Sequence, residues 1–132
     1  MKITPDTNVL ARALIGDDPD QAKAARDVLV EAELVALTAP ALCELVWVLS
    51  ASYHVPKADI AAAIRTLMQG ANAIADEATV EAGLAALEAG GDFADAVIDH
   101  EGRWLGAETF VSFDRRAIKL LEAQGSAARL LG

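Results

Sequence analysis

The sequence predicts an α/β fold of three layers, in which helices cover both faces of a parallel sheet of about five short strands. Short apolar segments alternate along the chain with longer segments of helical periodicity. None of the short segments alternates between apolar and polar residues, as expected for strands that are buried on both faces of a parallel sheet.

In the first half, Ile3 opens a short strand that ends near Pro5 and Asp6. Gly, Asp and Pro residues at positions 16–19 divide the next two helices, and the apolar segment that follows them ends at Thr38 and Pro40, which indicates a buried strand. The predicted helices are 7–15, 18–32, 39–53 and 57–69, and the second strand is 34–37.

In the second half, paired glycines at positions 90–91 separate two helices, and Gly125 precedes the last strand. The predicted strands are 73–74, 109–112 and 127–130, and the helices are 77–89, 93–105 and 115–124. No repeat or linker interrupts this order, so we expect one domain over residues 1–132.

The net charge of −9 is unusual for a protein that binds nucleic acid. The charge is uneven, because residues 103–132 carry +2 and residues 1–102 carry −11, so a small basic surface for phosphate is available near the C-terminus. A bound divalent cation would add positive charge at a reaction centre. The single cysteine and the lack of a long apolar run or secretory segment favour a cytoplasmic domain without membrane contact.

Acidic residues follow the predicted strands. Asp6 comes directly after the first strand, Asp114 after the fourth, and Glu44 in the first turns of the helix after the second. Ligands of parallel sheets bind beyond the carboxyl ends of the strands, so these three carboxylates are expected at one edge. Asp95, in the first turn of the helix before the fourth strand, is placed less directly by this argument.

Each of these residues also has a structural interpretation. Asp6, Asp92 and Asp114 each stand before a helix, where Asp is a favoured N-cap. Glu44 lies in a helix that is apolar on all sides, which predicts burial, and no Lys or Arg occurs from residue 32 to 55 to pair with it. A cation is therefore the favoured partner of Glu44, and a distant Arg is the alternative.

Three acidic residues, Asp92, Asp95 and Asp99, lie on nearly one face of a single predicted helix. Their mutual repulsion disfavours this arrangement unless a divalent cation is bound. Asp95 is the favoured ligand because its side chain should point back toward the strand ends, Asp92 is the expected cap, and the role of Asp99 is left open.

These motifs resemble those of the PIN-domain family. Within that family, the length of the chain and the residues of its motifs are similar to those of VapC-type toxins of bacterial toxin–antitoxin pairs. The resemblance rests on Asp6-Thr-Asn8, on Glu44, on Asp92-Phe-Ala-Asp95 and on Val111-Ser-Phe-Asp114, and it covers the whole chain. It implies an acidic catalytic quartet of Asp6, Glu44, Asp95 and Asp114, together with Mg²⁺ or Mn²⁺. Within that quartet we expect Asp6 and Asp95 to bind the metal, directly or through water. The resemblance also implies endoribonuclease activity, a homodimer and a small cognate antitoxin. It implies Asn8 and Ser112 as polar neighbours that position the quartet. Apart from the resemblance, Arg115 and Arg116 begin the helix after Asp114, so we expect them to meet RNA phosphates, with a solvated helix face as the alternative.

Other functions fit less well. A receiver domain needs adjacent acidic residues after its first strand and a Lys after its last, whereas Asp6 stands alone and only Arg129 is basic near the last strand. A haloacid-dehalogenase-like phosphatase needs Asp-x-Asp, but Thr7 and Asn8 follow Asp6. A PIN-like module without catalysis, kept to bind protein or RNA, is the remaining alternative.

Overall fold

The computed structural model describes all residues from 1 to 132, and it confirms the predicted α/β class with seven helices and five short strands. The chain forms two compact units, Met1–Asp76 and Glu77–Gly132, and each is described by itself. The first unit contains β1 (Lys2–Ile3), α1 (Thr7–Ile15), α2 (Pro19–Glu31), β2 (Leu34–Ala36), α3 (Ala39–Ala51), α4 (Lys57–Met68) and β3 (Ala73–Ile74). The second contains α5 (Glu77–Glu88), α6 (Phe93–Trp104), β4 (Phe110–Ser112), α7 (Arg115–Ala123) and β5 (Ala128–Leu130).

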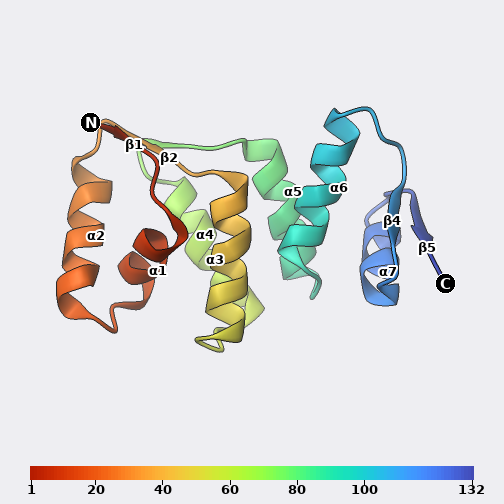
Figure 1. The fold of residues 1–132 in the computed structure, drawn as a ribbon, viewed down its shortest axis with the longest axis horizontal. Helices are drawn as coiled ribbons and strands as arrows, with labels where there is room; N and C mark the ends of the chain where they lie inside the picture. Colours follow the sequence, from red (N-terminus) through yellow and green to blue (C-terminus); the bar gives the residue numbers. More distant parts are fainter. The chain divides into compact units, whose positions relative to one another are not determined.

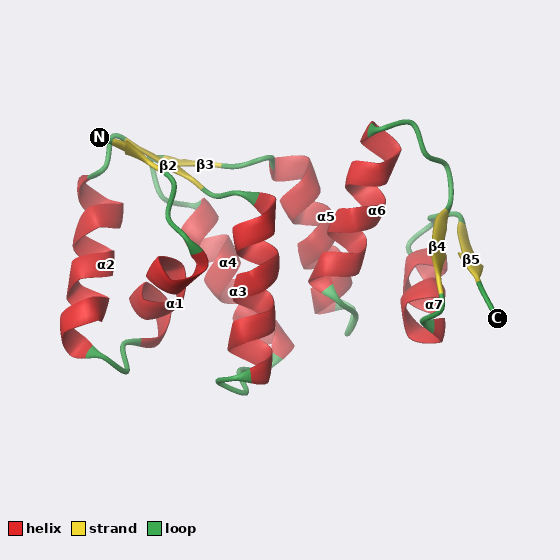
Figure 2. Ribbon diagram, in the orientation of Figure 1, coloured by secondary structure: helices red, strands yellow, loops and turns green.

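All strand pairs are parallel, as predicted. In the first unit the sheet has the order β1-β2-β3, with Ile3 beside Val35 and Val35 beside Ala73 (Figure 2). In the second unit β4 pairs with β5. The first strand is shorter than expected because it ends at Ile3, so the buried Pro5 lies in the loop, where its missing N–H removes no bond of the sheet.

Side chains at the loops fix where the helices of the first unit begin. The carboxylate of Asp18 caps α2 by accepting from the N–H of Gln21 at 3.1 Å, and the hydroxyl of Thr38 caps α3 by accepting from the N–H of Ala41 at 3.4 Å. Gly16 ends α1 in the left-handed conformation, with a φ of 69°, which a residue without Cβ adopts most easily. The sharp turn at Gly16 directs the chain into α2.

The core of the first unit lies between its helices and the sheet, where Leu10, Leu42, Leu49 and Ile60 are all at most 2% exposed. Figure 1 shows α1, α2, α3 and α4 within this unit. The prediction that α3 is buried on all sides is wrong. Leu42 and Leu49 face the core, but Glu44 is exposed and Trp47 is 68% exposed.

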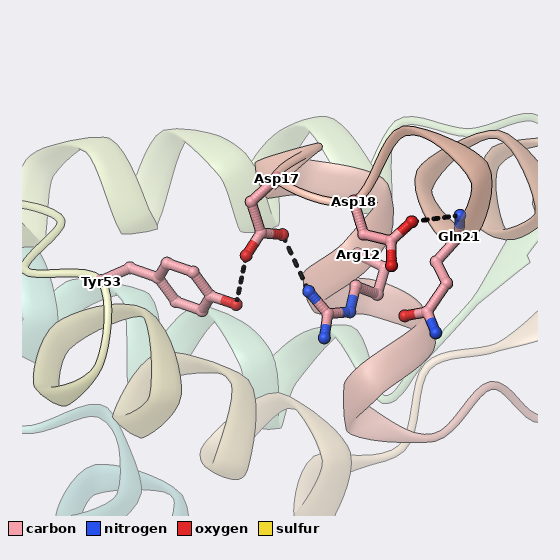
Figure 3. A network of polar contacts seen from close by, with 5 residues as sticks. All are labelled: Arg12, Asp17, Asp18, Gln21 and Tyr53. Atoms are coloured by element: carbon pink, nitrogen blue, oxygen red, sulfur yellow. Dashed lines mark hydrogen bonds and ion pairs between the residues drawn. The ribbon is translucent and has the colours of Figure 1, made fainter.

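A polar network joins the turn between α1 and α2 to the residues that follow α3. The Nη1 group of Arg12 donates to Oδ1 of Asp17 at 2.9 Å, and the hydroxyl of Tyr53 donates to Oδ2 of the same carboxylate at 3.2 Å (Figure 3). Since both carboxylate oxygens are engaged, Asp17 orients the Arg12 guanidinium and links it to Tyr53, which lies 36 residues after Asp17 in the sequence.

The second unit depends on close packing between its helices. At Gly83 of α5, a Cβ would lie only 2.5 Å from the ring of Phe93, so the missing side chain makes room for this fully buried residue of α6. Ala86, Ala96 and Leu121 join α5, α6 and α7 in one apolar cluster. This packing determines where the first turn of α6 lies.

Across the whole chain, the helices are too short or too polar to cross a lipid bilayer.

Candidate acidic site

Asp6 is the first of the predicted acidic residues along the chain, and it lies in the first unit. It is exposed, it follows β1 by three residues, and its Oδ1 accepts a hydrogen bond of 3.1 Å from the N–H of Val9. Asp6 is therefore the N-cap of α1, as its structural interpretation predicted. The cap engages Oδ1 only, which leaves Oδ2 as an oxygen that could bind a cation.

Glu44 is held beside this helix end by a residue that sequence reasoning missed. The hydroxyl of Thr7 donates a hydrogen bond of 2.7 Å to Oε2 of Glu44. Because Thr7 follows Asp6 directly, this bond joins Glu44 of α3 to the residue next to Asp6. The hydrogen-bond partner of Glu44 is therefore a hydroxyl and not the distant Arg that was the alternative, and a cation at Glu44 stays a prediction. The only signal for Thr7 was its place in the Asp-Thr-Asn motif.

Three carboxylates gather in the second unit. Asp95 is half-buried in the first turn of α6. Burial is the largest cause that raises the pKa of Asp95, to about 6, and the negative charges of Asp92 and Asp114 and a hydrogen bond with Asp92 add to it. The two groups that the sequence placed in one site, Asp95 and Asp114, are therefore near enough to repel each other.

Asp92 takes the expected N-cap position of α6, but its carboxylate does not bond a backbone N–H of the helix. Instead it lies beside Asp95. The prediction of Asp92 as the cap is thus correct for the position and wrong for the bond. A carboxylate that gives up a cap bond to face another carboxylate adds to the negative charge of this site.

Asp114 is fixed by its own turn. Its Oδ1 accepts from the N–H of Arg116 at 2.9 Å and of Ala117 at 3.3 Å, so it caps α7. Its own N–H donates to the hydroxyl of Ser112 at 2.9 Å. Ser112 therefore helps to orient the carboxylate, and Arg115 and Arg116 follow it as exposed cations at the start of α7.

The role of Asp99, which the sequence left open, is structural. Its side chain is 9% exposed, lies 3.4 Å from Nε of Arg103 and accepts a hydrogen bond of 2.9 Å from the hydroxyl of Ser126. A buried carboxylate with a cation and a hydroxyl as partners needs no metal ion to balance its charge. Asp99 joins α6 to the segment before β5.

The structure thus places Asp6, Asn8 and Glu44 in the first unit, and Asp95, Ser112, Asp114 and the two arginines of α7 in the second. No three His, Cys, Asp or Glu side chains are arranged so that together they could hold a metal ion. Each unit offers carboxylate oxygens, the ligand type that Mg²⁺ and Mn²⁺ prefer.

The family model of the PIN domain matches residues 3–122, and the chain belongs to this family. PIN domains are in general nucleases, so the match indicates nuclease-type hydrolysis and nucleic-acid binding. No curated protein is similar enough to this chain to count as a match.

Proposed function

We propose that this protein is a metal-dependent endoribonuclease that hydrolyses RNA phosphodiester bonds, and that it is the VapC-type toxin of a type II toxin–antitoxin pair. The observation that carries the proposal is the PIN-domain match over residues 3–122. We propose Asp6, Glu44, Asp95 and Asp114 as the catalytic quartet, because their carboxylates are the ligand type that divalent cations prefer.

The chemistry of these residues fits Mg²⁺ or Mn²⁺. Asp6 and Asp95 are the proposed ligands, since Asp6 uses one oxygen in its cap and Asp95 lies among carboxylates that favour a bound cation. When bound, such an ion lowers the pKa of a coordinated water and offsets the negative charge of the reacting phosphate.

The chain's own groups prepare this site in three ways. With its pKa at about 6, Asp95 is mostly a carboxylate at neutral pH and so able to bind a cation. Thr7 holds Glu44 by its 2.7 Å hydrogen bond, and the turn at Ser112 holds Asp114. Fixed carboxylates of this kind orient water without the cost of ordering side chains during the reaction.

Substrate and partners follow from the same proposal. Arg115 and Arg116 would meet RNA phosphates, and Asn8 and Ser112 would contact the backbone beside the quartet. A toxin of this type would act in the cytoplasm as a homodimer and would be held inactive by a small cognate antitoxin.

The experiment is cleavage of a structured RNA by the purified protein in Mg²⁺ or Mn²⁺. We expect endonucleolytic products that EDTA abolishes and that added metal restores. RNA that is bound but never cleaved, with either metal, would instead show a binding module that lacks catalysis.

A further inference from the structure

A groove opens between α1 and α2 beside Asp6, entirely within the first unit. Its volume is about 410 Å³, within the range of small-molecule sites in proteins. The α1 side contributes Asp6, Asn8, Val9 and Arg12, and the α2 side contributes Gln21, Ala24, Ala25 and Val28. Arg12 and Gln21 take no part in the proposed cleavage reaction.

The lining combines two kinds of side chain. Val9 and Val28, with the alanines of α2, form an apolar surface on which a flat ring could lie. Arg12, Gln21 and Asn8 supply hydrogen-bonding groups around it. Nucleobases need this combination, because their faces are apolar and their edges carry donors and acceptors.

Arg12 is held by an ion pair with Asp17. Its Nη1 donates to Asp17 at 2.9 Å, and Asp17 is held in turn by Tyr53 (Figure 3). Gln21, at the start of α2 and also drawn in Figure 3, lines the same groove as Arg12. The bond to Asp17 is made by one nitrogen of a guanidinium that has five N–H donors, so donors are left for a ligand.

The charge around Arg12 disfavours a phosphate in this groove. Asp17 pairs with the guanidinium, Asp18 is close enough to act on its charge, and Asp6 lines the same groove. A phosphate would meet these carboxylates with no cation left to balance it, whereas a neutral base would not be repelled. The chemistry therefore favours the base of a nucleotide over its phosphate.

We propose that this groove is a subsite that binds one RNA base next to the scissile phosphate, with Arg12 as the residue that selects guanine. The inference rests on the proposed ribonuclease function, since Asp6 is both a wall of the groove and a proposed metal ligand. Guanine presents two adjacent acceptors, O6 and N7, and a guanidinium is the group that most often binds both.

The test measures kcat/KM on short RNAs in which each base flanking the cleaved bond is varied in turn. The wild-type protein should prefer guanine at one flanking position by about tenfold or more. Arg12→Gln should lose that preference. Gln21→Ala should weaken cleavage at the same position.

Two control variants distinguish recognition from altered charge or stability. Lys23→Gln removes a positive charge from α2 at a residue that pairs with Asp27 outside the groove, and it should keep the guanine preference. Tyr53→Phe weakens the support of Asp17 without removing a groove residue, and it should keep the preference as well. Unchanged preference in Arg12→Gln, or none in the wild type, would overturn the proposal.

A binding assay separates this proposal from the proposed function. Fluorescently labelled RNA tetranucleotides are kept in EDTA, where the proposed metal-dependent hydrolysis cannot occur, and their affinities are compared for the wild type and Arg12→Gln. Guanine-selective binding that the variant loses supports the subsite even if no RNA is cleaved. Equal affinity for all bases refutes the subsite, even if RNA cleavage is found.

Discussion

The hydroxyl of Thr7 donates a 2.7 Å hydrogen bond to Oε2 of Glu44, across 37 residues of sequence. It is the only bond that links the first turn of α1 to a carboxylate of α3, and it sits next to Asp6, the N-cap of α1. Charge-assisted bonds of this kind are short and directional. Thr7 therefore controls where a proposed catalytic carboxylate points.

Thr7→Val should lower the rate of RNA cleavage about tenfold or more, the usual effect of removing a residue that orients a metal-site carboxylate. Stability should change by only about 1 kcal/mol, because the bond is exposed. Thr7→Ser keeps the hydroxyl and should keep most of the activity. The measurement is kcat in saturating Mg²⁺, with a melting curve for each variant. A wild-type rate in Thr7→Val would show that cleavage does not depend on the bond by which Thr7 orients Glu44.

Asp6→Asn and Asp95→Asn should each abolish cleavage and leave the fold intact. Asn is as good an N-cap as Asp, so α1 keeps its first turn in Asp6→Asn, and only the charge of the proposed ligand is lost. Asp59→Asn, in the first turn of α4 and outside the site, is the matched control and should cleave normally. The assay is single-turnover cleavage in Mg²⁺ with folding checked by circular dichroism. Cleavage at the wild-type rate by either site variant would refute the metal assignment.

Local signals were enough to predict the elements of this fold. Gly16, Pro19 and the glycines at 90–91 stop or start helices by backbone conformation alone, and the structure has its helix ends within two residues of the predicted ones. The caps at Asp6 and Asp114 were equally visible, because an N-cap depends on residues within one turn.

Long-range contacts could not be predicted in the same way. The apolar sequence of α3 suggested burial on all sides, but a helix buries only the stripe that meets other elements, and Glu44 and Trp47 lie outside it. The bond between Thr7 and Glu44 and that between Ser126 and Asp99 each join distant segments. The hydrophobic periodicity of a sequence does not show which distant residues form hydrogen bonds. The roles of Thr7 and Asp99 could therefore be found only in the structure.

Replacing Arg115 and Arg116 with Ala should weaken RNA binding and slightly stabilise the fold. Both are exposed in the first turn of α7, where the positive end of the helix dipole disfavours cations by about 0.3–1 kcal/mol each. RNA affinity should fall for all sequences alike, with a shallower dependence on salt. Filter binding at several salt concentrations measures this, with Lys23→Ala as a control for charge. Unchanged affinity would make the two arginines a solvated helix face.

The pKa of Asp95 gives the metal-free protein a pH-dependent stability. The pKa of Asp95 in the folded protein is about 6, above the value near 3.9 in the unfolded chain. The contribution of Asp95 to the free energy of unfolding is therefore most favourable below about pH 4 and is lost as pH rises through 6. Solvent screening at this half-buried carboxyl reduces the loss to about 1 kcal/mol. In EDTA, Asp95→Asn should therefore melt higher than the wild type at pH 7, and the difference should vanish near pH 4. A variant that melts lower at both values contradicts this account of Asp95.

Divalent metal should stabilise the wild-type protein in a saturable way, because a ligand that binds only the folded state adds RT ln(1 + [L]/Kd) to the unfolding free energy. At 100 times Kd this is about 2.7 kcal/mol, which for a chain of 132 residues raises the melting temperature by about 10 °C. A protein of net charge −9 gains some stability from any salt, so each Mg²⁺ or Mn²⁺ point is compared with KCl at equal ionic strength. Asp95→Asn should lose the extra shift and Asp59→Asn should keep it. If the divalent ions do no more than KCl, or if Asp95→Asn shifts as much as the wild type, then Asp95 binds no ion and its crowding with Asp92 and Asp114 requires another explanation.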